Sequence, residues 1–230
     1  MILFCLPYSG GSKNIFYKWT KNLSKDINMI PIELKGRGER TNEGFYKDIK
    51  DAVDDVVNII NKYSSDEDYI IFGHSLGGLL AYEAYFEIIR RNMKIPGIII
   101  FSGCAAPFLK RKTENISNLP DEIFINKVIS LGGTPKEITQ YKELLDIFIP
   151  ILHNDFRIIE EYEQNKNPQK ISCKSKIIYG HNDRMVNPNE IICWKECTEG
   201  EIEFYEIEGN HFYIKTEMEK VVEIINESIK

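Results

Sequence analysis

One serine of this sequence stands where it could act as a nucleophile. Ser75 is the centre of a Gly-x-Ser-x-Gly pattern, Gly73-His-Ser-Leu-Gly77, and glycines on both sides leave room for a backbone that comes too close for side chains. A strand-like run, 69–72, precedes it and a helix-forming run, 79–90, follows it. In this setting the serine projects from a sharp turn at a helix N-terminus, where backbone dipoles favour developing negative charge. The alternative is an ordinary serine in a glycine-rich turn.

A serine needs a base to remove its proton and a carboxylate to orient that base. The chain has four histidines. His74 is adjacent to the serine and should point away from it, while His153 falls in a long helical segment, so structural roles are expected for both. His181 and His211 both follow predicted strands. His211 lies after the last strand, where α/β-hydrolases place the base, and we expect it to serve as one.

Asp183 is the expected orienting acid. The strand predicted over 97–101 ends without a carboxylate, whereas the one over 176–179 leads directly to Asp183. The chain order Ser75, Asp183, His211 is the order that α/β-hydrolases use. The competing interpretation is a turn residue whose side chain bonds to its own backbone.

Acyl transfer also needs hydrogen-bond donors for the oxyanion. The backbone N–H of Leu76, directly after the nucleophile, is one expected donor. The loop after the first strand, Leu6-Pro-Tyr-Ser-Gly-Gly-Ser12, supplies the other in this fold. By position that donor is the Tyr8 amide, with Ser9 as the alternative.

The elements that must position these residues alternate between strands and helices. Apolar strings of strand length, several without alternation as in strands buried on both faces, cover 2–6, 28–34, 69–72, 97–101, 176–179 and 202–207. Segments with helical periodicity cover 48–63, 79–90 and 221–229. The alternation predicts a mostly parallel central sheet flanked by helices.

One connection is far longer than a parallel crossover requires. The segment of about 105–172 separates two consecutive predicted strands and is itself helical in pattern. A helix start signal lies at 119–122, a glycine-rich turn at 132–135, and a second apolar stretch follows to Phe156. We expect a helical insertion within a single domain that covers 1–230.

Composition fits a globular protein of one domain, with 43% hydrophobic and 28% charged residues among 230. No apolar run approaches the roughly 18 residues that a membrane span needs, and the first seven residues lack the charged segment and cleavage site of a signal peptide. We therefore expect a cytoplasmic protein without membrane association. A monomer is the simpler expectation for its oligomeric state.

Charge and cysteine content exclude further classes. The net charge of −6 argues against nucleic-acid binding, which needs a basic field. The five cysteines are scattered, an odd number without CxxC pairs, as expected in a reducing compartment. Cys193 and Cys197 are one helical turn apart, but no second pair completes a metal site, so we expect them to pack in the core and no metal to bind.

Seven short segments, spread over nearly the whole chain, carry a resemblance to one family in their residues, order and spacing. They are Leu6-Pro-Tyr-Ser-Gly-Gly-Ser12, Glu33-Leu-Lys-Gly-Arg-Gly-Glu-Arg40, Gly73-His-Ser-Leu-Gly-Gly78, Leu131-Gly-Gly-Thr-Pro135, Asn154-Asp-Phe-Arg157, Gly180-His-Asn-Asp183 and Gly209-Asn-His-Phe212. In them the chain resembles the type II thioesterases that accompany nonribosomal peptide and polyketide synthases. Lys35 stands where that family usually has proline, and Asn210 where glycine often precedes the base. Both departures concern loop shape rather than chemistry.

The resemblance implies the α/β-hydrolase fold, with the insertion as a lid over the acyl chain. It implies hydrolysis of acyl or aminoacyl thioesters held on the phosphopantetheine arm of carrier proteins, which clears misprimed or stalled units. Ser75, His211 and Asp183 would act through an acyl-enzyme, with the Tyr8 and Leu76 amides holding the oxyanion. No cofactor is expected, because phosphopantetheine belongs to the substrate.

Carrier proteins are generally acidic, as this chain is, so their docking should use local positive charge. The candidates are Lys35, Arg37 and Arg40 near the site, or the basic run Lys110-Arg-Lys112 at the start of the insertion. Either group could instead be solvated surface. The Arg37 and Arg40 side chains could also pair with carboxylates and hold their own loop.

Two other functions fit the same sequence. A small-molecule carboxylesterase would use the same triad, although the Gly-Arg-Gly-x-Arg segment and the lid pattern argue against it. A noncatalytic binding protein could retain the hydrolase fold, although the complete set of nucleophile, base, acid and oxyanion loop argues against that.

Overall fold

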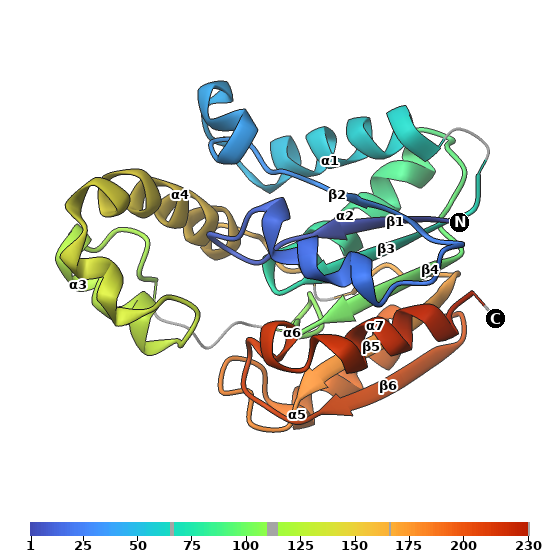
Figure 1. The fold of residues 1–230 in the computed structure, drawn as a ribbon. Coiled ribbons are helices and arrows are strands. Elements are labelled where there is room, and N and C mark those ends of the chain that lie inside the picture. The colour runs from blue at the N-terminus through green and yellow to red at the C-terminus, as the bar shows by residue number, and fades with distance from the viewer. Residues whose placement is uncertain (65–66, 110–114, 166, 230) are drawn as a thin grey trace.

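A single parallel sheet forms the centre of the molecule (Figure 1). The structure is a computed structural model and describes residues 1–64, 67–109, 115–165 and 167–229. Its strands are β1 (Ile2–Leu6), β2 (Asn28–Pro31), β3 (Tyr69–His74), β4 (Ile98–Ser102), β5 (Lys174–Gly180) and β6 (Ile202–Ile207). They lie in the order β2-β1-β3-β4-β5-β6, and every neighbouring pair is parallel.

Helices cover both faces of this sheet. The α-helices are α1 (Ile49–Ser64), α2 (Leu76–Arg90), α3 (Asp121–Ser130), α4 (Lys142–Glu160), α5 (Pro188–Ile191), α6 (Tyr213–Thr216) and α7 (Met218–Glu227). The 3-10 helices are η1 (Lys13–Lys21), η2 (Gly38–Glu43), η3 (Lys136–Gln140) and η4 (Ile192–Cys197). One apolar cluster joins the sheet to α1, α2 and η4, and a second joins its other face to η1, α6 and α7.

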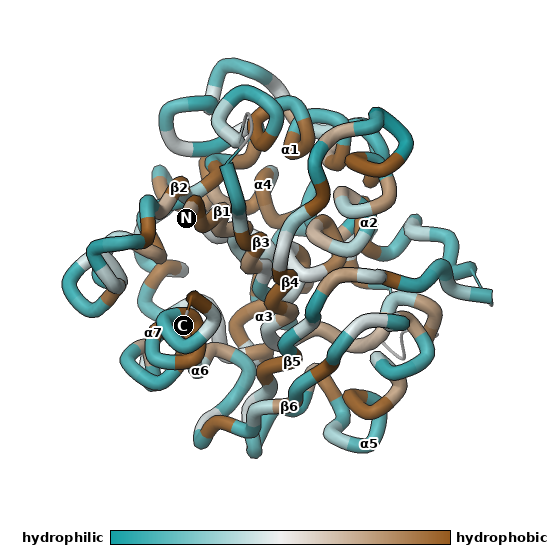
Figure 2. The backbone as a smooth tube through the Cα atoms, turned by 90° about the vertical axis from the view of Figure 1, so that its right-hand side faces the viewer, coloured by the Kyte–Doolittle hydropathy of each residue, from teal (hydrophilic) through white to brown (hydrophobic). Residues whose placement is uncertain are grey.

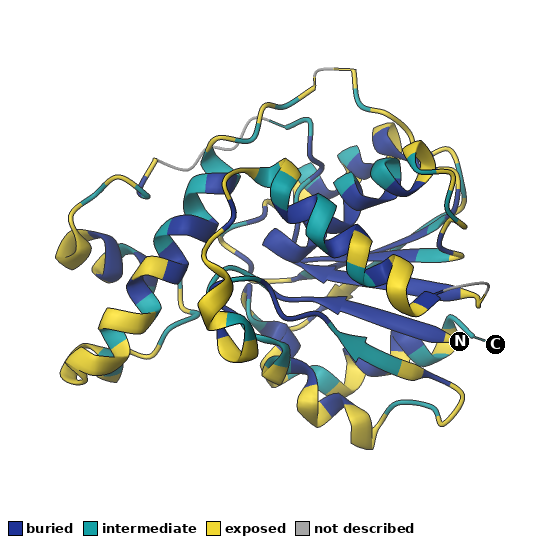
Figure 3. Cartoon of the chain, turned by 90° about the horizontal axis from the view of Figure 1, so that it is seen from above, coloured by how far each residue is buried: buried dark blue, intermediate teal, exposed yellow. Residues whose placement is uncertain are grey.

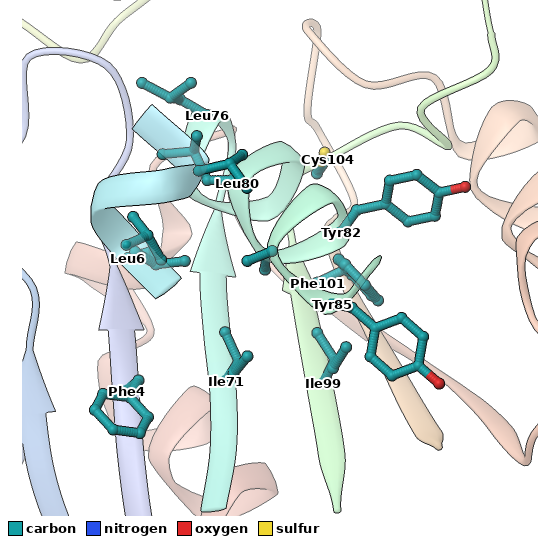
Figure 4. Close-up of a cluster of buried hydrophobic side chains, with 14 of the residues drawn as sticks. Phe4, Leu6, Ile71, Leu76, Leu80, Tyr82, Tyr85, Ile99, Phe101 and Cys104 are labelled. Atoms are coloured by element: carbon teal, nitrogen blue, oxygen red, sulfur yellow. The ribbon is translucent and has the colours of Figure 1, made fainter. Parts of the chain in front are cut away.

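The central strands are apolar along their whole length because both of their faces are buried. In β1, Phe4 and Leu6 belong to the first cluster, while Leu3 and Cys5 belong to the second. Figure 2 shows the hydrophobic residues gathered along these strands, and Figure 3 shows the same strands buried. In Figure 4, side chains of β1, β3 and β4 pack with those of α2.

The predicted architecture is confirmed. Strands β1 and β6 have the bounds that their apolar runs predict, and α1 and α7 differ from the predicted helices by a few residues at their ends. Two differences matter more. Helix α2 begins at Leu76 rather than at residue 79, so the helix starts directly after Ser75. Strand β2 ends at Pro31 rather than at residue 34, and as the edge strand it tolerates a proline whose missing N–H faces no neighbouring strand.

The long connection between β4 and β5 contains α3, η3 and α4. Figure 1 shows α3 and α4 on the side of the body opposite to the N-terminus. They share a small apolar cluster of their own, made of Ile116, Phe124, Ile125, Val128, Ile149 and Leu152. Near the other end of α4, Ile158 joins the main core. Helix α4 therefore links the two clusters.

Within the described residues, no helix is both long enough and apolar enough to cross a membrane.

Candidate active site

Ser75 occupies a strained turn between β3 and α2. Its φ of 55° and ψ of −113° lie in a region that non-glycine residues rarely adopt. The Ser75 amide donates to the Ser102 carbonyl at 2.8 Å, which fixes the turn against β4. A Cβ at Gly73 would lie 2.1 Å from the Gly77 carbonyl oxygen, and one at Gly77 would lie 2.3 Å from the Leu6 carbonyl oxygen. The flanking positions must therefore be glycine, as the sequence pattern indicates.

Asp183 and His211 meet at the ends of β5 and β6. His211 Nδ1 donates to Asp183 Oδ2 at 2.7 Å, and both side chains are buried. The amides of Met185 and Val186 donate to Asp183 Oδ1 at 2.7 and 3.1 Å. Asp183 thus forms the local turn of the competing interpretation and also contacts the histidine, so the two interpretations are compatible.

The second nitrogen of His211 is buried and bonds to no described residue. Because Nδ1 donates its hydrogen to the carboxylate, the neutral ring carries its lone pair on Nε2, which is the atom a general base uses. No hydrogen bond joins Nε2 to Ser75. Catalytic contacts are often longer in an unliganded site and shorten when substrate binds.

His74 belongs to a buried hydrogen-bond chain instead of acting on Ser75. Tyr213 Oη donates to the Ile178 carbonyl at 2.8 Å and therefore accepts from Ser102 Oγ at 2.6 Å. Ser102 Oγ in turn accepts from His74 Nδ1 at 2.8 Å, which assigns the His74 hydrogen to Nδ1. Burial, together with the nearby His211 ring, holds the pKa of His74 well below its usual value. His74 is a neutral support beneath the site.

The two expected oxyanion donors come from different elements. Leu76 is the first residue of α2, so its amide has no acceptor within the helix. The Tyr8 ring packs against His74 and Phe212 at centroid distances of 5.8 and 5.3 Å. Neither amide donates to another described residue. Their role as oxyanion donors stays a prediction.

The prediction that Arg37 lines a docking surface is wrong. Arg37 is only 3% exposed and forms a two-pronged ion pair with Asp155. Arg40 pairs with Asp55 and Glu43, so the alternative prediction, that both arginines pair with carboxylates, is confirmed.

Lys35 lies 3.4 Å from Asp51. The other docking candidate, Lys110-Arg-Lys112, lies outside the described residues. Sequence reasoning missed Asp155 as the partner of Arg37, because the two are far apart in the chain. The one signal in the sequence is that each lies in one of the seven segments that resemble the thioesterase family.

Across the described part of the chain, no group of three or more His, Cys, Asp or Glu side chains could hold a metal ion. Cys193 and Cys197 are free thiols, and Cys197 packs in the main core.

Comparisons with known proteins cover the whole of this fold. The family model described as "Thioesterase domain" matches residues 1–229. The linear gramicidin dehydrogenase LgrE of Brevibacillus parabrevis is 28% identical over 100% of this chain and 88% of its own length. The probable anguibactin biosynthesis thioesterase AngT of Vibrio anguillarum is 30% identical over 95% of this chain and 88% of its own length. The crystal structure of ClbQ, from the colibactin NRPS/PKS pathway, is 35% identical with a TM-score of 0.94, covering 99% and 96% of the two chains.

Proposed function

This chain belongs to the thioesterase domain family, and we propose that it serves a nonribosomal peptide or polyketide synthase by releasing acyl or aminoacyl groups from carrier proteins. The bond cleaved is the thioester to the phosphopantetheine arm, and its cleavage returns a blocked carrier to use. Support for the pathway comes from ClbQ, which belongs to the colibactin NRPS/PKS pathway, and from AngT, a probable thioesterase of anguibactin biosynthesis. Support for the chemistry comes from the site.

The observation that carries the proposal is the buried Asp183–His211 pair beside the strained Ser75 turn. The carboxylate fixes the ring so that the lone pair on Nε2 is free to take a proton. In the proposed reaction Ser75 Oγ attacks the thioester carbonyl carbon and its proton passes to His211 Nε2. The carbonyl oxygen becomes an oxyanion, which the Leu76 and Tyr8 amides stabilise.

The remaining steps return the site to its starting state. The tetrahedral intermediate collapses, the carbon–sulfur bond breaks, and the leaving thiolate takes the proton from His211. Water, deprotonated by the same nitrogen, then attacks the acyl-serine. Breakdown of the second tetrahedral intermediate releases the carboxylic acid and restores the Ser75 hydroxyl.

The dehydrogenase name of LgrE does not favour hydride transfer for this chain. Strand β1 leads into Pro7-Tyr-Ser-Gly-Gly-Ser12 rather than the Gly-x-Gly-x-x-Gly turn of dinucleotide-binding folds. The groups at the end of β3 are those of acyl transfer.

The test is a comparison of kcat/KM for the same acyl group on a carrier protein, on free phosphopantetheine and on a simple ester. We expect the carrier-bound thioester to be the best substrate, and Ser75→Ala to lower its turnover about 10⁴-fold or more. A clear preference for the simple ester would instead indicate a small-molecule carboxylesterase. Turnover that survives Ser75→Ala would refute the acyl-enzyme mechanism.

A further inference from the structure

A buried ion pair outside the triad touches the loop that should carry one oxyanion donor. Arg37 Nη1 and Nη2 donate to Asp155 Oδ2 and Oδ1 at 2.7 and 2.6 Å. Arg37 is 3% exposed and Asp155 is fully buried. Arg37 follows β2, and Asp155 lies in α4, so the pair joins the sheet edge to the insertion.

Both members of the pair also bind the backbone of the oxyanion loop, which we define as residues 7–12. The Gly10 amide donates to Asp155 Oδ2 at 2.7 Å, and the Gly11 carbonyl accepts from Arg37 Nη1 at 3.1 Å. The Gly11 amide donates to the Tyr8 carbonyl at 2.8 Å, which closes the turn that follows the expected donor. The loop is therefore held at Gly10 and Gly11, two and three residues after Tyr8.

Helix α4 contacts this loop through apolar side chains as well. A Cβ at Gly10 would lie 2.6 Å from Leu152 Cδ2 and 3.1 Å from Phe148 Cζ, so no side chain fits between the loop and the helix. The same helix is fixed to the body, because Asn154 Nδ2 and Arg157 Nη2 both donate to the Tyr46 carbonyl, at 2.8 and 2.9 Å.

Stability alone is a weak reason for such a pair. Burying two charges costs about as much as their attraction returns, and well-packed apolar side chains are often equally stable. What the pair adds is orientation, since a two-pronged arginine–carboxylate contact fixes direction as well as distance. Oxyanion donors need that control, because a displacement of about 1 Å can cost roughly 100-fold in rate.

We propose that Arg37 and Asp155 are positioning residues for the oxyanion hole. Asp155 holds the Gly10 amide, Arg37 holds the Gly11 carbonyl, and together they set the direction in which the Tyr8 amide points. Because Asp155 belongs to α4, the insertion contributes to catalysis through this contact and not only by covering the substrate. This inference rests on the proposed function, since it assumes that the oxyanion loop serves acyl transfer at Ser75.

Three variants test the positioning role: Asp155→Asn, Arg37→Lys and the apolar double variant Arg37→Met/Asp155→Leu. Arg40→Met is the matched control, because Arg40 belongs to the same segment and pairs with Asp55 and Glu43 without touching the oxyanion loop. The readouts are kcat and KM on a small acyl thioester and the affinity for a trifluoromethyl ketone analogue of it. Ser75 adds to this ketone, its proton passes to His211, and the ketone oxygen becomes an oxyanion.

We expect kcat to fall about 10- to 100-fold in the three variants, with KM changed no more than about 3-fold. Affinity for the ketone should weaken by the same factor as kcat, while affinity for the matching alcohol, which forms no oxyanion, should not change. The control should alter kcat less than about 3-fold. A double variant that melts like the native protein but keeps native kcat and ketone affinity would overturn the proposal.

A measurement on the unaltered protein gives an independent test. The Gly10 amide should exchange its hydrogen slowly in NMR, because a buried carboxylate accepts it. Rapid exchange would overturn the positioning role even if every variant failed to fold. If the native protein did not hydrolyse carrier-bound thioesters, while the variants showed the expected losses on a small thioester, the carrier-protein function would be refuted and this inference would stand.

Discussion

Asp183 combines two tasks through its two oxygens. Oδ1 accepts from the amides of Met185 and Val186, and Oδ2 accepts from His211. The turn thus fixes the carboxylate independently of the histidine, so that orienting the imidazole costs little additional side-chain entropy. The same arrangement fixes which ring nitrogen carries hydrogen, and this is the property that a base needs.

Replacing Asp183 by asparagine should therefore impair catalysis more than folding. The amide preserves shape but can donate to Nδ1, which favours the tautomer with hydrogen on Nε2. We expect kcat to fall about 10⁴-fold, measured on an acyl thioester alongside a thermal melt. The control is Glu206→Gln, since Glu206 pairs with the exposed His181 at the same edge of the sheet. A loss below 10-fold would mean that Asp183 does not orient the base.

The meeting of Asp183 and His211 could be predicted from the sequence because each follows a strand and parallel strands bring their ends to one edge. The same reasoning cannot find the Arg37–Asp155 pair. These residues are separated by 118 positions, and neither periodicity nor strand order indicates which carboxylate an arginine will meet. The two arginines of one short segment, the buried Arg37 and the partly exposed Arg40, also look alike in the sequence.

At the scale of elements, the approach of α2 to the sheet decides where Ser75 lies. Gly77 faces the Leu6 carbonyl at the end of β1, and the helix can begin at Leu76 only because nothing separates the two backbones. Figure 4 shows Leu76 and Leu80 of α2 in the same apolar cluster as Leu6. The periodicity places the start of α2 three residues too late, because glycines carry no hydrophobic pattern. The start is set instead by this backbone contact.

We expect Gly77→Ala to lower the free energy of unfolding by about 2 kcal/mol or more, because the added methyl group would overlap backbone atoms that cannot rotate away. Urea denaturation followed by circular dichroism measures this. Gly97→Ala is the control, since a Cβ there would lie at an ordinary 3.9 Å from the Tyr69 carbonyl oxygen. Equal stabilities of the two variants would contradict the close approach.

A carboxylate at the β5–β6 edge of the sheet, Glu203, should make the free energy of unfolding depend on pH. Hydrogen bonds from Lys174 and Tyr205 lower the pKa of Glu203 to about 2. A carboxylate with a lowered pKa stabilises the fold above its unfolded pKa of 4.5. This contribution is lost as the pH falls from there toward 2. Because the side chain is 33% exposed, solvent screening limits the effect to about 1 kcal/mol.

Comparing urea denaturation of the native protein and Glu203→Gln between pH 7 and pH 3 isolates this group. The variant should lose about 1 kcal/mol at pH 7 and should converge with the native protein at low pH. A difference that persists unchanged at pH 3 would show that Glu203 stabilises the fold by packing rather than by charge.

Within the described residues, apolar clusters on the two faces of the sheet form the body of the molecule, and α4 joins one of them to a smaller cluster in the insertion. The smaller core packs α3 against α4, and several apolar side chains of this region remain in solvent: Ile123, Tyr141, Leu144 and Ile147 are between 50% and 62% exposed. Helix α2, by contrast, is buried along most of its length. Local stability should therefore fall from the sheet toward α3.

Hydrogen exchange read by mass spectrometry should resolve this gradient. We expect peptides from α3 to exchange faster than those from α2, with the segment of α4 around Asp155 closer to α2 because its polar side chains bind the body. Uniform protection across the three helices would mean that the insertion opens only with global unfolding.

The position of the insertion in the chain has a consequence for how the protein is made. Ser75 and the oxyanion loop are synthesised before it, whereas Asp183, His211 and the strands that carry them emerge after it. Until β5 pairs with β4, the nascent chain exposes the edge of an apolar strand, Ile98–Ser102, which is a template for pairing with other chains. Under the proposed mechanism the emerging protein is inactive, because its proposed base and acid are not yet synthesised. Its β4 edge is open to aggregation throughout the synthesis of the insertion.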